Sequence, residues 1–487
     1  MIILFLFVHN TNGGIMEYKS IWESNINNNN IRKNKKFEEI ETDVLIIGAG
    51  ITGITSAYFL MNSNKKVIVI DKGIAGDGIS AKTTAKITYL QQDVYSKLSK
   101  MHGIDVAKKY YNSQKDAIDI IKRIINENNI ECDFENVSSV IFTNEDINAK
   151  KIEKEKEILL SWNNKVNDYT DGFIKYGLIV DDTYVFNPIK YLNSLRKIIE
   201  KKIPIYENTM ATGIKKKDNF YIVNTNRGRV ITKDIVMACH YPFFIIPHFF
   251  PLKTYIEREY VCASTVDNPK KIALINIDKE LYSVRYYKNY LIYVSNDHRL
   301  TSKTNYHENY QKSINNFKKY FNKEPEYIWM NQDIISNDRL PFIGKIKNNL
   351  YIASAYNAWG ISNGTIGGKI VADLIMDKDN EYKIVFNPNR INMSLVINSF
   401  IGIFHYLRVY FLGLFKRNNP YYVKIKGIIY GIYKDDEGIT HKIKLICPHM
   451  KCALLFNQKE KTWDCPCHGS RFDLDGNIIE TPSVKKI

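Results

Sequence analysis

Two short apolar runs enclose a helical segment in the first part of the chain. Residues 44–47 and 67–70 are rich in Val and Ile, as buried strands are, and each run ends at a glycine or an acidic residue. Between them, apolar residues recur at the spacing of one helix face, at Ile54, Ala57, Tyr58 and Leu60. This order of apolar and polar positions predicts a β-α-β unit over residues 43–71.

The turn between the first strand and the helix has the spacing Gly48-x-Gly50-x-x-Gly53. Gly48 would permit a tight turn, Gly50 would let the backbone approach a pyrophosphate, and Gly53 would let the helix pack on the strand. Asp71, at the end of the second strand, would accept hydrogen bonds from a ribose. Such turns also occur in α/β proteins that bind no nucleotide, but the complete set of strand, helix, strand and acid favours dinucleotide binding.

Three later segments carry related chemistry. Residues 72–88 are rich in Gly, Ser and Thr, which suits contacts to phosphate and flavin. Residues 338–344 have the sequence DRLPFIG, and a strand-like run follows at 349–357. Glycines then open a helical run at 358–375, whose N-terminus could place its positive end against the pyrimidine of a flavin.

Together these motifs resemble the FAD-dependent oxidoreductases of the D-amino acid oxidase and glycine oxidase class. The resemblance covers residues 40–380 and implies a Rossmann-like α/β FAD-binding domain with an α+β substrate domain, inserted at about 90–205 and 245–330. Only one dinucleotide fingerprint is present, which favours FAD over NAD. The FAD contacts that the resemblance implies are Gly48, Gly50, Gly53, Asp71, Thr83, Thr84, Asp338, Gly344, Gly360 and Gly364.

No catalytic acid or base stands out in this region. Residues 231–242 resemble the family's late strand near the adenine, although the usual Ala-Thr-Gly is Ala-Cys-His here. His240 and Tyr241 follow that strand, where a lone His is more often structural than catalytic. Residues 104–126 are predicted to form one helix, and its apolar stripe is typical of a core.

Four cysteines and two histidines gather near the end of the chain. The pattern is Cys447-Pro-His449, a spacer, then Cys465-Pro-Cys467-His468, with Cys452 between the two groups. Two loops that each give one Cys and one His supply the ligands of a Rieske [2Fe–2S] cluster, two thiolates and two imidazoles. A zinc ribbon or zinc knuckle is the alternative, but zinc would require neither Gly469-Ser470 nor the extra pair of cysteines.

The pattern resembles the Rieske domain almost letter for letter, over residues 419–487, and implies a small all-β domain. The resemblance implies Cys447, His449, Cys465 and His468 as cluster ligands and a disulfide between Cys452 and Cys467. It places Ser470 as a hydroxyl donor to a cluster sulfur and Phe472 where higher-potential members carry Tyr. Only nineteen residues follow His468, and no upstream segment offers a His₂-carboxylate iron site, so a Rieske oxygenase is excluded.

A strongly apolar segment, residues 393–417, lies within the linker at 381–418. Asn398, Gly402, His405 and Arg408 fall at helical spacing and form a narrow polar stripe. An Arg near the centre of a spanning helix would cost about 2.5–3.5 kcal/mol. We therefore expect a helix packed between the two domains, with weak association at a membrane surface as the alternative.

Composition sets further limits. The chain has 487 residues and a net charge of +16, but Lys, Asn and Ile are frequent throughout, so no nucleic-acid partner is expected. Cys132, Cys239 and Cys262 are scattered and odd in number, which favours a reduced, cytoplasmic compartment. Residues 1–39 are expected to be an N-terminal extension, in which Met16 is a more ordinary start than Met1.

These observations predict an enzyme, an FAD-dependent oxidoreductase with a Rieske centre. Electrons would pass from a small organic reductant, plausibly an amine or amino acid, through FAD to the [2Fe–2S] cluster and then to an external acceptor. The alternatives are an electron-transfer protein reduced by NAD(P)H or associated with a membrane, and a redox sensor without turnover. The absence of a second nucleotide fingerprint disfavours a dedicated NAD(P)H domain.

Overall fold

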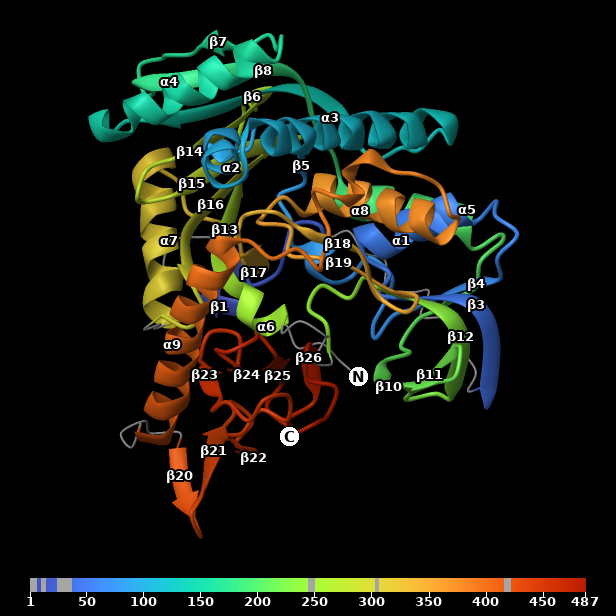
Figure 1. Ribbon diagram of the computed structural model, residues 1–487. Coiled ribbons are helices and arrows are strands. Elements are labelled where there is room, and N and C mark those ends of the chain that lie inside the picture. Colours follow the sequence, from blue (N-terminus) through green and yellow to red (C-terminus); the bar gives the residue numbers. More distant parts are fainter. Residues whose placement is uncertain (1–6, 10–14, 24–36, 244–249, 303–305, 416–421) are drawn as a thin grey trace.

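The computed structural model describes residues 7–9, 15–23, 37–243, 250–302, 306–415 and 422–487. Two large sheets form the main body, and a small unit of antiparallel strands follows at the C-terminal end (Figure 1). The main body is α/β with mixed sheets, and the described part of the C-terminal unit is built of small antiparallel strands, as the sequence predicts.

The first sheet has eight strands in the order β10-β11-β12-β3-β4-β9, with β19 beside β12 and β18 beside β19. β3, β4, β9, β12 and β19 run parallel, and residues 44–47 of β3 are buried. The strands are β3 (Glu39–Ile47), β4 (Val67–Ile70), β9 (Ile205–Tyr206), β10 (Ala211–Lys217), β11 (Phe220–Thr225), β12 (Arg229–Met237), β18 (Phe342–Lys347) and β19 (Leu350–Ser354).

Helix α1 (Ile51–Leu60) joins β3 to β4, so the predicted β-α-β unit is confirmed. It packs against α8 (Gly360–Ile375), the helix that the late glycines open. A Cβ at Gly364 would lie 2.6 Å from Ile51, and one at Gly368 would lie 2.7 Å from Thr55. Glycines therefore set the close crossing of these two helices.

The second sheet has eleven strands in the order β1-β2-β17-β13-β16-β15-β14-β6-β8-β5, with β7 beside β8. Its strands come from chain segments that alternate in sequence with those of the first sheet. The strands are β1 (Phe7–His9), β2 (Ile15–Glu17), β5 (Lys86–Ile87), β6 (Glu135–Thr143), β7 (Asn167–Asp168), β8 (Tyr176–Val185), β13 (Thr254–Thr265), β14 (Ile272–Asn276), β15 (Tyr282–Tyr287), β16 (Tyr290–Arg299) and β17 (Tyr327–Ser336).

Helices surround the two sheets. The single helix predicted over 104–126 is present as α3 (Ile104–Glu127), and Tyr110, Ala117 and Ile121 of its stripe are buried. The other helices are α2 (Val94–His102), α4 (Asp146–Ser161), α5 (Pro188–Ile199), α6 (Phe250–Lys253), α7 (Tyr306–Phe321) and the 3₁₀ turns Ile79–Ala81 and Glu381–Lys383.

Part of the expected N-terminal extension belongs to the second sheet. β2 pairs with β17, and the Trp22 side chain is fully buried. Its ring packs edge-on against Tyr287, and its indole nitrogen donates to the Thr83 carbonyl at 2.7 Å. The segment therefore braces the loop that follows β4. That translation starts at Met16, and not at Met1, remains a prediction.

The linker forms helix α9 (Met393–Phe415), which packs on α6 and β13. Asn398 of the polar stripe donates to the Asn337 carbonyl at 2.9 Å, and Tyr406 donates to the Thr254 carbonyl at 3.2 Å. One face of α9 thus lies against the main body, as expected. Within the described ranges, no helix has the length and apolar character needed to cross a membrane.

The C-terminal unit consists of two small antiparallel sheets. β20 (Tyr422–Ile425), β21 (Ile428–Lys434) and β22 (Thr440–Lys444) form one. The other contains β23 (Leu455–Asn457), β24 (Thr462–Asp464), β25 (Arg471–Phe472) and β26 (Ile478–Glu480). Trp463 lies between them, fully buried, against Phe456 and against Gly431, where any Cβ would meet its ring.

Candidate redox site

A cavity of about 500 Å³ lies where the two sheets meet the C-terminal unit. Its wall includes the turn after β3, the loop after β4 and the start of α8. Strands β13 and β17 of the second sheet and residues of the C-terminal unit complete the wall. Of the residues predicted from sequence, those in the wall are Gly48, Gly50, Asp71, Thr83, Thr84, Gly360 and His468.

The turn after β3 is built so that only glycine fits at two positions. Gly48 has a φ of +108°, and a Cβ on it would lie 2.4 Å from the Ala238 carbonyl oxygen. A Cβ on Gly53 would lie 1.8 Å from the Gly48 carbonyl oxygen. The tight turn brings the N-terminus of α1 to the cavity, where its free N–H groups and dipole favour a phosphate.

Asp71 ties the two loops of this cradle together. Its carboxylate accepts from the Ala49 N–H at 2.7 Å and from the Gly73 N–H at 2.8 Å. Burial raises the pKa of Asp71. A carboxylate fixed in this way at the cavity wall is placed to accept a ribose hydroxyl on its remaining lone pairs.

The cluster motif forms a second site, built from the β22–β23 and β24–β25 loops. Cys447 and Cys465 are buried and their sulfurs are hydrogen-bonded to each other, which lowers the pKa of Cys447 to about 7. The rings of His449 and His468 lie 5.1 Å apart, centroid to centroid. Cys452 and Cys467 form a disulfide that joins the two loops.

Both histidines present a ligand atom without a partner. Nδ1 of His449 and Nδ1 of His468 are buried, and neither has a hydrogen-bond partner among the described residues. Burial lowers the pKa of His449 to about 4 and that of His468 to about 3, so both rings are neutral at pH 7. The two neighbouring loops therefore carry two thiols and two neutral imidazoles, which is the donor set of a Rieske cluster.

His468 also belongs to the wall of the large cavity, together with Gly469 and Glu480. Its ring stacks on Tyr406 of α9 at 5.1 Å and lies 5.5 Å from Tyr241, which follows β12. One ligand of the cluster site therefore faces the same cavity as the dinucleotide cradle.

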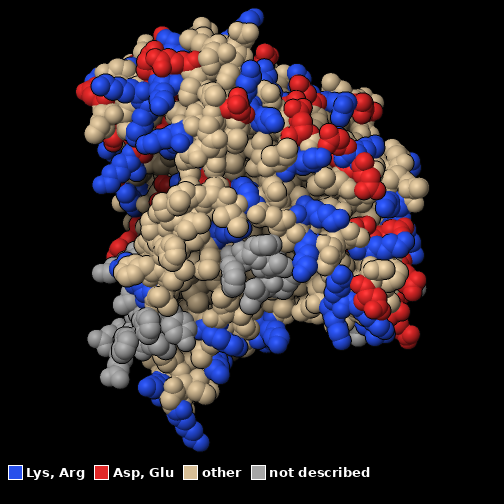
Figure 2. Space-filling view, viewed as in Figure 1, with Lys and Arg blue, Asp and Glu red and all other residues tan. Residues whose placement is uncertain are grey.

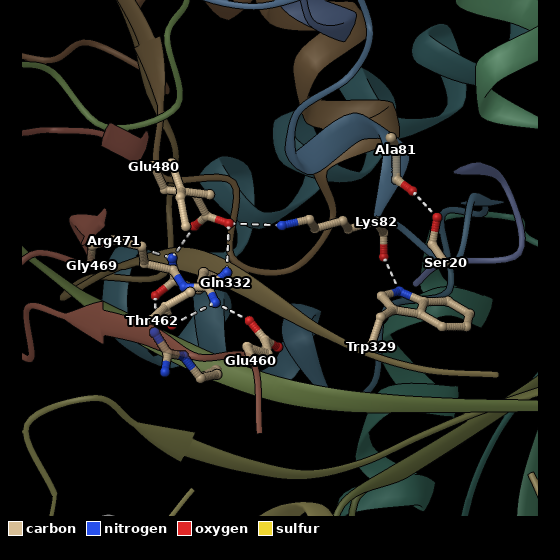
Figure 3. Close-up of polar contacts among 12 residues, drawn as sticks. Ser20, Ala81, Lys82, Trp329, Gln332, Glu460, Thr462, Gly469, Arg471 and Glu480 are labelled. Carbon is tan, nitrogen blue, oxygen red and sulfur yellow. Dashed lines mark hydrogen bonds and ion pairs between the residues drawn. The ribbon is translucent and has the colours of Figure 1, made fainter. Parts of the chain in front are cut away.

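A buried polar network holds the C-terminal unit in this place. Glu480 pairs with Lys82 at 2.8 Å and with Arg471 at 3.2 Å, and it also accepts from Gln332 of β17 (Figure 3). Gln332 donates in addition to the Gly469 carbonyl at 3.3 Å. The Lys82 carbonyl accepts from Trp329, so the network joins the loop after β4, the second sheet and the cluster loop (Figure 3).

Arg258 of β13 and Asp464 of β24 form a second link. Their side chains are 0% exposed and lie 2.9 Å apart. Asp464 also pairs with Arg471 at 3.2 Å, and Arg258 donates to Gln332 at 2.7 Å. Because Asp464 directly precedes Cys465, this ion pair fixes the second cluster loop against the sheet.

Comparison with known proteins decides the family. Residues 43–374 match the family of FAD dependent oxidoreductases, and residues 407–487 match the Rieske [2Fe-2S] domain.

The chain is a member of the FAD-dependent oxidoreductase family.

The oxidoreductase is 28% identical to YhfW of Bacillus subtilis (strain 168) over 476 residues, which cover 92% of this chain and 93% of that protein. It is 20% identical to the gamma-glutamylputrescine oxidoreductase of Escherichia coli (strain K12), over 69% of this chain and 84% of that one. The crystal structure of glycine oxidase from Geobacillus kaustophilus superimposes with a TM-score of 0.61 at 13% identity, covering 72% of this chain and 99% of that one.

The residues present fit both cofactors, FAD and a Rieske [2Fe–2S] cluster. The glycine cradle that no Cβ could enter fits a dinucleotide, and the two orphaned imidazole nitrogens beside two thiols fit the cluster. The disulfide excludes Cys452 and Cys467 as ligands. The Ser470 hydroxyl is hydrogen-bonded to the Cys447 thiol and accepts from the Ser483 N–H at 2.9 Å, as its expected role next to a cluster sulfur requires.

Four predicted FAD contacts do not line the cavity. Gly53 lies against Gly48 and Ile46 in the turn after β3, Gly364 lies at the crossing of α8 with α1, and Gly344 lies near Pro388. Asp338 is fully buried, where Arg390 pairs with it at 2.7 Å and holds its pKa below the usual range although burial opposes this. Direct contact of these four residues with FAD stays a prediction.

Several residues of the site escaped sequence analysis. Lys82 and Glu480 belong to the network around His468, and Glu259, Asn331 and Asp333 line the cavity from the second sheet. Lys82 lies within the segment 72–88 but is not one of its Gly, Ser or Thr residues, and the other four lie on strands with no motif around them. The sequence signal for these residues is the alternation of acidic and basic residues at 257–259, and this pattern does not show whether the side chains point into a cavity or to solvent.

Proposed function

We propose that this oxidoreductase oxidises a small amine or amino acid and passes the electrons through its Rieske centre to an external acceptor. The observation that carries this proposal is the position of His468, which lies in the wall of the cavity that contains the dinucleotide cradle. Bound FAD supplies two-electron acceptance from an organic substrate, and the [2Fe–2S] cluster supplies one-electron transfer.

The electron balance of the proposed reaction is simple. The amine loses two electrons and two protons, one proton from its C–H bond and one from its N–H bond, so that its C–N single bond becomes the C=N bond of an imine. Two equivalents of a one-electron acceptor protein are reduced, and two protons are released to solvent. The chain's own residues hold the substrate in the cavity and keep His468 against it through the Glu480 network.

Related proteins support an amine as the substrate. The gamma-glutamylputrescine oxidoreductase of Escherichia coli and the solved glycine oxidase are named for compounds that carry an amino group. The low identities restrict the solved structure to evidence of fold, so the substrate class is part of the proposal. A cytoplasmic location, inferred from the scattered free thiols, is part of it as well.

Anaerobic mixing of the holoenzyme with a panel of amines and amino acids tests the proposal. We expect loss of flavin absorbance, followed by the paramagnetic signal of a reduced Rieske cluster. Flavin bleaching by NADH or NADPH, with no response to any amine, would refute amine oxidation and favour the alternative, an electron-transfer protein that is reduced by NAD(P)H. Bleaching without cluster reduction would refute the electron path.

The outer face of α9 supports a location at a membrane surface. Apolar side chains at helical spacing are exposed there, among them Phe400 and Phe404, each 69% exposed. Residues 382–434 contain Lys and Arg but no Asp or Glu, and Lys424 and Lys426 are exposed on the adjoining hairpin. Figure 2 shows uncharged atoms over α9 and blue side chains below it. An apolar stripe beside basic residues fits an anionic lipid surface.

Vesicle sedimentation of the full-length holoenzyme tests this location. We expect the protein to pellet with phosphatidylglycerol vesicles and to stay in solution with phosphatidylcholine vesicles. Replacing Phe400 and Phe404 by Ser should abolish pelleting, whereas Phe173→Ser, an exposed Phe on the substrate domain, should not. Failure to pellet with either vesicle would refute membrane association.

A further inference from the structure

Three polar residues on the second sheet line the cavity opposite the glycine cradle. Glu259 of β13 lies beside Asn331 of β17 in the strand register, and Asp333 follows two residues later on the same face. The Asn331 amide nitrogen donates to Glu259 at 3.1 Å and to Asp333 at 3.0 Å. The amide thus holds the two carboxylates side by side.

Asn331 leaves an acceptor unused at this place. Its side chain is only 4% exposed, and its Oδ1 atom has no hydrogen-bond partner in the part of the chain that the structure describes. An orphaned buried carbonyl costs about 1–3 kcal/mol, so such atoms usually mark a missing partner. Glu259 and Asp333 offer only acceptor atoms when ionised. With both carboxyls ionised, as they would be beside a bound cation, the three side chains present acceptors and no free donor.

The charge around this group is unbalanced. Neither Glu259 nor Asp333 forms an ion pair within the described residues, although Lys86 approaches Glu259 while donating to Ser283. The titratable groups that act on them are the acids Glu257 and Asp297 and the base Lys86, and Arg339 acts in turn on Glu257. Four carboxylates against two cations leave the site short of positive charge.

The pKa values of both carboxyls reflect this deficit. Burial raises the pKa of Glu259, and burial together with Glu259 and Glu257 raises the pKa of Asp333 well above its ordinary value. Buried carboxylates become stable when a cation pairs with them. A ligand cation that enters the cavity would therefore meet an electrostatic site that the chain itself does not neutralise.

The cavity offers little to an anion at the same place. No Arg lines it within the described residues, and of its two lysines Lys82 is paired with Glu480 and Lys72 donates to the Ile479 carbonyl. A free carboxylate is best bound by the bidentate fork of Arg. The wall therefore favours a cation over a carboxylate.

We infer that Glu259, Asn331 and Asp333 form a subsite for the protonated amino group of the substrate, and that this substrate is an amine without a free α-carboxylate. Three acceptors match the three N–H donors of a primary ammonium group. The inference rests on the proposed function and narrows it from amines and amino acids to cationic amines.

Binding of a probe that cannot be oxidised tests the subsite separately from turnover. tert-Butylammonium has no hydrogen on the carbon next to nitrogen, so it cannot be oxidised to an imine. tert-Butanol carries the same tert-butyl group without a charge, and pivalate carries it with a negative charge. We expect tert-butylammonium to perturb the flavin spectrum of the holoenzyme and to bind about tenfold or more tightly than either analogue. Equal binding of the three probes, or preference for pivalate, would refute the subsite whatever the enzyme oxidises.

Isosteric variants locate the effect. Glu259→Gln and Asp333→Asn should each weaken tert-butylammonium binding by about tenfold or more and leave tert-butanol binding unchanged. Glu280→Gln, a control at a carboxylate on the outer surface, should change neither. If both cavity variants bind the ammonium probe as the native protein does, the assignment is wrong.

Discussion

The ion pair between Arg258 and Asp464 is the strongest single link between the cluster loop and the second sheet. Both side chains are 0% exposed, and their nitrogen and oxygen lie 2.9 Å apart. Arg258→Met keeps a long, apolar side chain in place but removes the charge, so Asp464 loses one of its two cations. We expect the Rieske domain to separate more often from the sheet.

The size of the effect follows from the burial of the pair. Removing one partner of a buried ion pair costs about 3–5 kcal/mol. Arg471 remains 3.2 Å from Asp464, so the lower end, about 3 kcal/mol, is expected here. At 1.4 kcal/mol for each factor of ten, the docking equilibrium should shift by about a hundredfold.

Hydrogen exchange of the holoenzyme measures this shift. Protection of the amides in β24–β26 and at their contacts with β13 should fall by about a hundredfold, because each opening event becomes that much more frequent. Amides of β3 and α1 should exchange as before. Asp436→Asn, which breaks a surface pair with Lys461 in the same domain, should change protection by less than about fivefold. Unchanged protection in Arg258→Met, or loss throughout the chain, would refute this account of docking.

Three further predictions concern the cofactor sites and the pH response. Gly53→Ala should abolish FAD retention, measured by flavin absorbance after gel filtration, whereas Gly172→Ala should retain it, because Gly172 lies outside the cavity wall and no atom lies within 4 Å of a Cβ there. Ser470→Ala should lower the midpoint potential of the cluster by roughly 40–90 mV, which is the equivalent of one hydrogen bond of about 1–2 kcal/mol. Phe472→Tyr should raise the midpoint potential. Redox titrations that show no change in either variant would contradict both expectations. Burial opposes protonation of His441, but hydrogen bonds to two carboxylates raise its pKa. The contribution of protonated His441 to folding stability is therefore complete below about pH 6.5, the pKa in the unfolded chain, and is lost as the pH rises through the higher pKa of the folded state. Thermal unfolding should therefore show a loss of at most about 1 kcal/mol between pH 6 and pH 9, which His441→Gln removes.

The cofactors could be predicted from sequence because their motifs are local. Gly48 and Gly53 lie five residues apart, and each cluster loop carries its ligands within four residues. Backbone conformation and metal coordination impose such spacings directly, so they are visible in one sequence. The fold class followed from these motifs and from the alternation around them.

The arrangement of the two sites could not be predicted, since it depends on contacts between distant segments. Glu259 and Asn331 meet only through the register of β13 and β17, and Arg258 lies 206 residues before Asp464. Trp22 was expected in an extension, yet it is fully buried. Apolar and charged positions in these strands alternate like those of any half-buried sheet, so the sequence carries no sign of which partner each residue meets.

The seating of His468 in the cavity wall has a kinetic consequence. Separate carriers must find one another by diffusion, and their exchange slows as the proteins are diluted. Here the second carrier is tethered by α9 and already in place, so its effective concentration is set by the fold and not by expression level. On the proposed electron path, each flavin site would have its own outlet for electrons, in fixed one-to-one proportion, and only the final acceptor would have to arrive from outside.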